Sequence, residues 1–309
     1  MSSPVLTRPE GSEPADFHLS RRALGGLMFA GYALGAGPIN AKTITTDSEG
    51  LITREATVPA ADGFDLPVYL ATPADTRRRR PVVIVVSEIF GLHEYIRDTT
   101  RRLAKAGYVA VAPAFFVREA DPAPITDFAR IREIVGKASH AQVMSDIDST
   151  LRWLDTNPDI GQGRQIGGRR RFADMNRVGI TGFCWGGAVT WLAVAENPRI
   201  KSGVAWYGRL VRPQPGGFLA EPERVWPVEV AARLNGPVLG LYAENDQGIP
   251  LADVEAMRAA LRQAGKTDSE IVVYPDARHG FHADYREVYK ADAAQDGWNR
   301  LLDWFRRTL

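Results

Sequence analysis

Residues 182–187, Gly182-Phe183-Cys184-Trp185-Gly186-Gly187, decide the fold that we predict for this chain of 309 residues. They follow a predicted strand over 177–183 and open a predicted helix over 186–196. The motif G-x-S-x-G at such a junction exposes a nucleophile on a sharp turn, and here Cys stands in place of Ser. The glycines let two backbones pass closely, and the helix N-terminus favours a thiolate. The motif therefore predicts a nucleophile at Cys184, with a buried structural cysteine as the alternative.

Strands and helices alternate on both sides of this motif. The predicted strands are 52–59, 64–71, 81–87, 108–112, 177–183, 201–207, 237–243 and 270–274. The predicted helices are 94–106, 140–157, 186–196, 251–264 and about 290–307. This alternation predicts an α/β-hydrolase fold, with a mainly parallel sheet covered by helices on both faces and active groups at the carboxyl ends of the strands. The first two strands should pair antiparallel, and 161–176 should be a surface loop away from the chemistry.

Composition places the chain among ordinary soluble globular proteins, because 45% of its residues are apolar and 24% are charged. The formal net charge is +1, which indicates neither nucleic acid nor an acidic membrane surface as a partner. The single cysteine excludes an internal disulfide. We expect residues 42–309 to form one domain.

The first 41 residues resemble an export signal. Ser20-Arg21-Arg22-Ala23-Leu24 precedes a short, weakly apolar, glycine-rich stretch and then small residues around Ala36 and Ala41. This order is typical of a secretory signal, too short to span a bilayer, and the paired arginines resemble a twin-arginine signal. It predicts export by the twin-arginine machinery to the periplasm or beyond. A tail with a chance Arg-Arg pair is the alternative.

Two partners for Cys184 follow in the chain order that this fold requires, acid first and histidine last. Asp246 comes just after the predicted strand 237–243, and His279 just after the strand 270–274. Both should therefore lie at the edge of the sheet that carries Cys184. There an imidazole could take the thiol proton, and a carboxylate would orient the imidazole. Glu244 is the rival acid and His282 the rival base.

The chain resembles the dienelactone hydrolase family from about residue 56 to its C-terminus. The resemblance rests on Ser87-Glu88-Ile89-Phe90-Gly91, Ala112-Pro113, the GFCWGG motif and Arg278-His279-Gly280-Phe281. It implies a triad of Cys184, Asp246 and His279. It also implies that Glu88 contacts the thiol and helps to form the thiolate when substrate arrives. The backbone N–H groups of Ile89 and Trp185 would hold the oxyanion.

The family also binds a substrate carboxylate with two arginines, and here the match is partial. Arg118 occupies the position of the first, whereas Ala283 stands where the second is expected. Arg286 could reach the site from further along the chain. Five aromatic residues could line an apolar pocket beside the cysteine: Phe115, Phe116, Trp185, Trp206 and Tyr207.

The function that these residues predict is hydrolysis of a lactone or an activated carboxylic ester through a thioester at Cys184. A general carboxylesterase or an acyl transferase on the same scaffold is a second hypothesis, and a secreted, non-catalytic binding protein is a third. We expect a small-molecule ester or lactone as the substrate. The sequence contains no evident metal-ligand cluster, phosphate loop or dinucleotide motif, so no metal or cofactor is implied.

Overall fold

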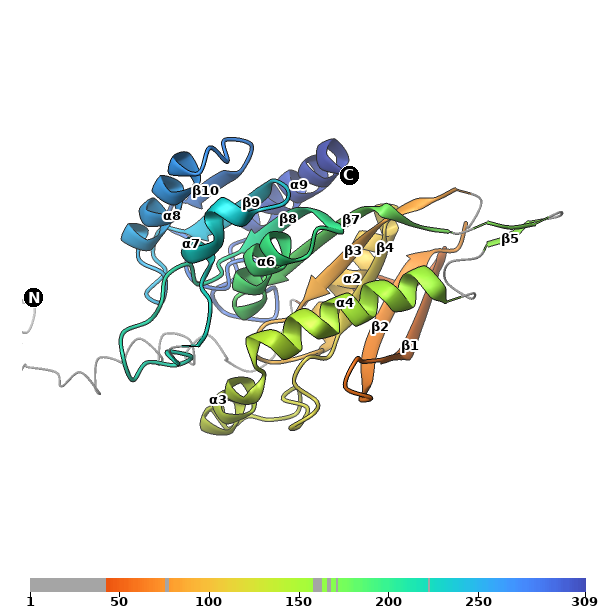
Figure 1. Ribbon diagram of the computed structural model, residues 1–309, viewed down its shortest axis with the longest axis horizontal. Coiled ribbons are helices and arrows are strands. Elements are labelled where there is room, and N and C mark those ends of the chain that lie inside the picture. The colour runs from red at the N-terminus through yellow and green to blue at the C-terminus, as the bar shows by residue number, and fades with distance from the viewer. Residues whose placement is uncertain (1–42, 76–77, 158–162, 166–167, 171, 222) are drawn as a thin grey trace, which may run out of the picture.

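The computed structural model describes residues 43–309 apart from 76–77, 158–162, 166–167, 171 and 222. The main sheet has eight strands in the order β1-β2-β4-β3-β7-β8-β9-β10 (Figure 1). Their bounds are β1 Leu51–Pro59, β2 Asp65–Pro73, β3 Arg80–Val86, β4 Val109–Pro113, β7 Ala173–Phe183, β8 Ile200–Trp206, β9 Val238–Ala243 and β10 Glu270–Tyr274. The predicted signal segment 1–41 lies outside the described residues, so export stays a prediction.

The sheet is parallel except at one edge. β1 pairs antiparallel with β2, and β2 antiparallel with β4. From β4 through to β10 every neighbouring pair is parallel. Residues 82–86 of β3 are fully buried, because helices cover the central strands on both faces. The predicted α/β-hydrolase fold is confirmed.

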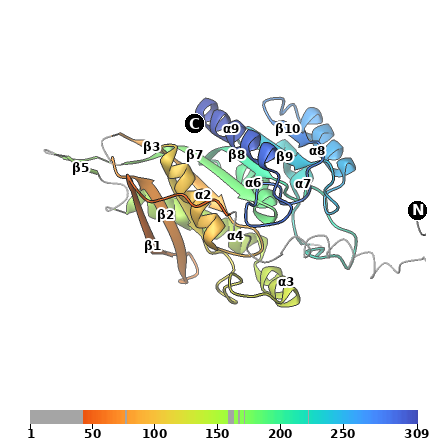
Figure 2. The same cartoon turned by 180° about the vertical axis from the view of Figure 1, so that it is seen from behind.

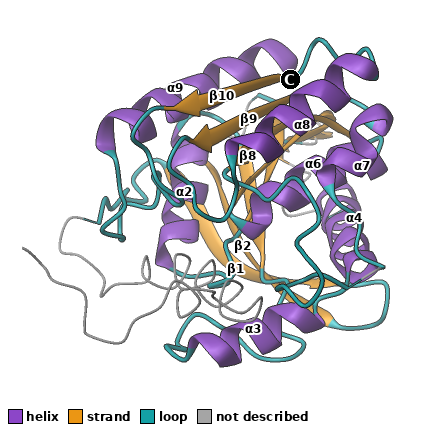
Figure 3. Ribbon diagram, turned by 90° about the vertical axis from the view of Figure 1, so that its left-hand side faces the viewer, coloured by secondary structure: helices purple, strands orange, loops and turns teal. Residues whose placement is uncertain are grey.

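Helices α2 and α9 lie on one face of the sheet, and α4, α6 and α8 lie on the other (Figures 1, 2 and 3). The helix bounds are α2 Glu94–Lys105, α3 Phe128–Lys137, α4 His140–Thr156, α6 Trp185–Glu196, α7 Pro227–Val230, α8 Leu251–Gln263 and α9 Ala291–Thr308, with a 3₁₀ turn, η2, at Ala231–Arg233. Within the described ranges, none of these helices combines the length and the apolar character that a membrane span requires.

The register of β3 against β7 positions the site. Val86 pairs with Gly182 at the carboxyl ends of the two strands, so residues 87–89 and 183–185 leave the sheet side by side. The chain continues from β3 to β4 on one side, while β7 lies on the other side of β3. Such a switch point is where open α/β sheets bind their ligands.

Two segments differ from the sequence-based expectation. No element was expected over 128–137, yet α3 forms there, because Asp127 accepts a hydrogen bond from Ala129 N at 2.9 Å and an apolar face of α3 is buried. The expected loop over 161–176 is wrong in part, since β5 Gly163–Gln165 pairs with β6 Gly168–Arg170 and β7 already begins at Ala173. Pairing of Ala173 with Arg80 lengthens the β3–β7 ladder before a bulge at Pro81/Val82.

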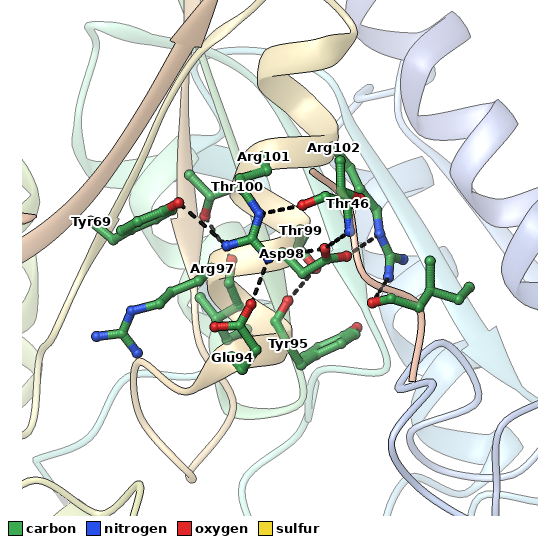
Figure 4. A network of polar contacts seen from close by, with 12 residues as sticks. Thr46, Tyr69, Glu94, Tyr95, Arg97, Asp98, Thr99, Thr100, Arg101 and Arg102 are labelled. Atoms are coloured by element: carbon green, nitrogen blue, oxygen red, sulfur yellow. Dashed lines mark hydrogen bonds and ion pairs between the residues drawn. The ribbon is translucent and has the colours of Figure 1, made fainter. Parts of the chain in front are cut away.

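A buried ionic network on α2 holds the beginning of the described chain (Figure 4). Asp98 accepts a hydrogen bond from Thr46 N and forms ion pairs with Arg101 and Arg102. Arg101 Nε donates to Thr46 O at 2.8 Å, and Arg102 also pairs with Asp284 in the loop before α9. Asp98 thus joins the N-terminal segment, α2 and that loop.

We expect Asp98→Ala to destabilise the fold by about 3–5 kcal/mol, because it leaves two arginines near a buried site without their shared partner. Urea unfolding of the purified variant measures the loss. The matched control is Asp303→Ala, which breaks an exposed ion pair with Arg306 and should cost less than about 1 kcal/mol. Equal losses in the two variants would contradict a structural role for the network.

Candidate active site

Cys184 lies at the turn between β7 and α6, where it is the N-cap residue of the helix. Its φ of 56° and ψ of −114° fall where residues other than glycine are strained. Its backbone N–H donates to Trp206 O at 3.0 Å, and only 2% of the residue is exposed. The sulfur is therefore held on a sharp turn at the positive end of a helix dipole, which stabilises a thiolate.

Two glycines make this turn possible. A Cβ on Gly182 would lie 2.2 Å from Gly186 O, and a Cβ on Gly186 would lie 2.4 Å from Val86 O. Neither position has room for any side chain. The start of α6 is therefore pressed against the ends of β3 and β7.

Asp246 and His279 lie on the loops after β9 and β10 and meet each other. His279 Nδ1 and Asp246 Oδ2 are 2.6 Å apart, and both residues are buried. Asp246 Oδ1 accepts from the backbone N–H groups of Gly248 and Ile249 at 2.8 and 3.1 Å. The carboxylate is thus fixed by three hydrogen bonds and fixes the imidazole in turn.

The rival acid and base have other partners. Glu244 is exposed and accepts a hydrogen bond from Asp276 N at 3.1 Å. His282 is buried, with Nδ1 2.6 Å from the Tyr95 hydroxyl and its ring 4.4 Å from that of Trp206. Burial keeps the pKa of His282 well below its ordinary value. Of the two acids, Asp246 is the one that contacts His279.

The charge state of His279 is set by its neighbours. Burial alone would lower its pKa, but the Asp246 carboxylate and Cys184 together outweigh burial and raise the pKa of His279 to about 10. The imidazole is therefore protonated at neutral pH, beside the sulfur.

This raised pKa makes stability depend on pH. The folded chain holds the His279 proton more tightly than the unfolded chain, whose pKa is near 6.5. The resulting stability is fully present below about pH 6.5 and is lost as pH rises towards 10. We expect urea unfolding between those pH values to show a loss on the order of a few kcal/mol in the wild type. The same series on His279→Gln should be flatter; an unchanged slope would contradict the assignment.

The backbone N–H groups of Ile89 and Trp185 are the expected oxyanion donors. Ile89 follows the end of β3, Trp185 is the first residue of α6, and both line one cavity with Cys184. Within the part of the chain that the structure describes, neither N–H donates a hydrogen bond to another protein group. Two such donors are available to a developing oxyanion.

Glu88 lies beneath this site and is fully buried. Its Oε2 accepts a hydrogen bond from the Tyr285 hydroxyl at 2.6 Å, and its Oε1 lies 3.6 Å from Arg286 Nη1. No sequence motif marks Tyr285, so its contact with Glu88 was not expected, and Arg286 was expected only as a residue that could reach the site. Ala283, at the position of the family's second arginine, is buried, and Arg286, three positions later, is buried beside Glu88.

Arg118 is engaged elsewhere. Its guanidinium makes two hydrogen bonds to Asp146, at 2.7 and 2.8 Å, and two to Asp62, at 2.9 and 3.1 Å. The same group lies over the ring of Phe64, 4.5 Å from its centroid. A substrate would have to displace a carboxylate to reach this arginine. The function proposed below therefore does not use Arg118.

A cavity of about 40 Å³ lies beside the sulfur. Eight residues line it. Four lie at or near the Cys184 turn, namely Ile89, Cys184, Trp185 and Ala188, and four lie in the segment between β8 and α7, namely Arg209, Phe218, Leu219 and Trp226. Of the five aromatic residues expected there, only Trp185 lines this cavity, and Phe115 and Phe116 pack against its ring. The sequence analysis missed Arg209 and Trp226 because neither belongs to a recognisable motif.

The fold and this site define an α/β-hydrolase. The model of the dienelactone hydrolase family matches residues 66–309. The chain belongs to that family and is a hydrolase.

Individual relatives extend the match over most of the chain. A protein of Methylorubrum extorquens named "putative carboxymethylenebutenolidase" is 49% identical over 292 residues, which make up 94% of this chain and 93% of that protein. A protein of Escherichia coli K12 with the same name is 43% identical over 279 residues, 90% of this chain and 95% of that protein. The crystal structure titled "putative dienelactone hydrolase" from Klebsiella pneumoniae has 43% identity and a TM-score of 0.73, covering 83% of this chain and 99% of that one.

Proposed function

We propose that the protein hydrolyses a lactone or an activated carboxylic ester through Cys184, His279 and Asp246, with a thioester intermediate. The observation that carries this proposal is the 2.6 Å contact between His279 and Asp246, made beside a cysteine on a strained elbow. The names of the relatives support a lactone as the substrate class.

In the first half of the reaction the Cys184 thiolate attacks the ester carbonyl, so that an S–C bond forms. The N–H groups of Ile89 and Trp185 stabilise the oxyanion. The C–O bond then breaks, and the protonated His279 gives its proton to the departing oxygen. The raised pKa of His279 suits this donation, because the imidazole already carries a proton at neutral pH.

In the second half His279 acts as a base. Acylation removes the negative charge of the sulfur, and with it one of the influences that raise the pKa of His279. The neutral imidazole takes a proton from water, and the hydroxide attacks the thioester. The C–S bond breaks, which returns the thiolate and releases the acid. Asp246 keeps the imidazole oriented throughout.

Glu88 supports the thiolate in this proposal. Its buried carboxylate pairs with Tyr285 and Arg286. Glu88 directly precedes the proposed oxyanion donor Ile89 in the chain. In the form of the site in which Cys184 still holds its proton, a substrate that draws Arg286 away would free Glu88 to accept that proton.

We expect Cys184→Ala to lower kcat/KM for aryl esters and lactones by about a thousandfold or more, because no other group at the elbow can form the acyl-enzyme. Acyl transfer to the wild-type protein should appear as an adduct on Cys184 by rapid-quench mass spectrometry. Circular dichroism checks that the variant is folded.

A matched pair of acid variants accompanies this test. Asp246→Asn should lose activity strongly, whereas Glu244→Gln, an exposed acid two positions earlier, should keep it. A folded Cys184→Ala variant with wild-type turnover would refute the thioester mechanism.

A further inference from the structure

The segment between β8 and α7 brings a cation to the cavity that holds Cys184. In Figure 1 it forms the long loop that runs down from α7. Arg209, at the beginning of this segment, is half-buried and lines the cavity together with Cys184 and Trp185. Apart from Arg209 and Cys184, the residues that line this cavity are aliphatic or aromatic. A charged side chain is unusual in such surroundings.

Three other arginines, none of which lines this cavity, have partners within the fold. Arg286 pairs with Glu88, and Arg118 with Asp146 and Asp62. Arg224, which lines the adjoining cavity, donates to Glu221 Oε2 at 2.7 Å and to backbone carbonyls of residues 136 and 138. Their charges are satisfied within the fold.

Arg209 differs from them. Among the described residues it makes no hydrogen bond and no ion pair. Burial raises the pKa of Asp253 on α8, and the positive charge of Arg209 opposes that shift although the two side chains form no ion pair. The Arg209 guanidinium therefore keeps its donors available to a ligand.

A second donor lies in the same wall. Trp226 is only 5% exposed and lines both the cavity beside Cys184 and the adjoining one, and its indole Nε1 is buried without an acceptor. An indole N–H can only donate, and a buried donor without a partner is costly. A ligand whose acceptor oxygen reached this indole would satisfy it.

The backbone fixes where Arg209 leaves the sheet. Tyr207 has a φ of 38°, which is strained for a residue with a side chain. A Cβ on the next residue, Gly208, would lie 2.2 Å from Ala188 N, in the first turn of α6. The residue before Arg209 is thus packed against the first turn of α6, a few positions after Cys184.

We propose that Arg209 and Trp226 form an anion subsite that binds a carboxylate carried by the ester substrate. A guanidinium fork with an added neutral donor matches the two oxygens of a carboxylate. This inference rests on the proposed hydrolase function and assigns substrate specificity to the β8–α7 segment, in place of Arg118.

Paired substrates test the subsite. The carboxylate can belong to the acyl part or to the leaving phenol, so two pairs are compared: mono-4-nitrophenyl glutarate with 4-nitrophenyl pentanoate, and 4-acetoxybenzoate with phenyl acetate. For the pair that the site accepts, Arg209→Gln should lower kcat/KM of the carboxylated ester about 10- to 100-fold, mainly through KM, and leave the neutral ester within about twofold. Arg209→Lys should recover part of the loss, and Trp226→Phe should show a smaller loss of the same kind.

The control is Arg262→Gln, which removes one exposed positive charge at the end of α8 and should change neither ester. Equal effects of Arg209→Gln on carboxylated and neutral esters in both pairs would overturn the subsite.

Binding separates this proposal from the catalytic one. Calorimetric titration of glutarate and of benzoate into the Cys184→Ala variant needs no turnover. At least one of the two should bind about tenfold more weakly when Arg209→Gln is added. Unchanged affinity for both ligands overturns the subsite and leaves the triad untouched, whereas turnover that survives Cys184→Ala refutes the triad and leaves the subsite untouched.

Discussion

The close approach of backbone at the junction of β3, β7 and α6 is the constraint on which the site depends. Gly182 and Gly186 leave room for no side chain against each other or against Val86 O. Because the strands cannot move apart without losing their ladder, the turn between them must take the strained conformation of Cys184. The same contact brings the chain after β3 within reach of the sulfur. The proposed nucleophile, the proposed oxyanion donors and Glu88 are therefore brought together by one packing contact.

Local signals in the sequence were enough to predict this much. The elbow motif, the alternation of strands and helices, and the chain order of Asp246 and His279 all depend on residues close to strand ends, where the topology determines their placement. Side-chain partners far apart in the chain could not be predicted in the same way. Tyr285 and Glu88 are 197 positions apart, and Arg118 and Asp62 are 56 apart. These pairs form because whole helices, strands and loops pack together, and a local sequence pattern does not predict which of them will be in contact. Helix α3 did carry a local signal in its cap and its apolar spacing, and that signal was overlooked.

The charged groups considered for the site are of two kinds. Glu88, Asp246 and Arg118 have partners at short distance, so their charges serve the fold and are costly to disturb. Arg209 has no such partner among the described residues. The paired groups keep the site preorganised, whereas a cation without an ion-pair partner can bind an anionic ligand without first breaking a contact within the protein. Dienelactone hydrolases with different substrates could keep the same elbow and differ in this outer segment.

The ionic network on α2 has a consequence for the ends of the protein. Ile44 and Thr46 contact the arginines of α2 through their backbone carbonyls, and Arg102 continues to Asp284, two positions before Arg286. The N-terminal segment is thus connected mechanically to the loop that restrains Glu88. This connection limits how far the chain can be shortened, because a protein that began after Thr46 would expose Asp98 to water and loosen the support behind the site. Tags and proteolytic trimming are best kept upstream of Thr43.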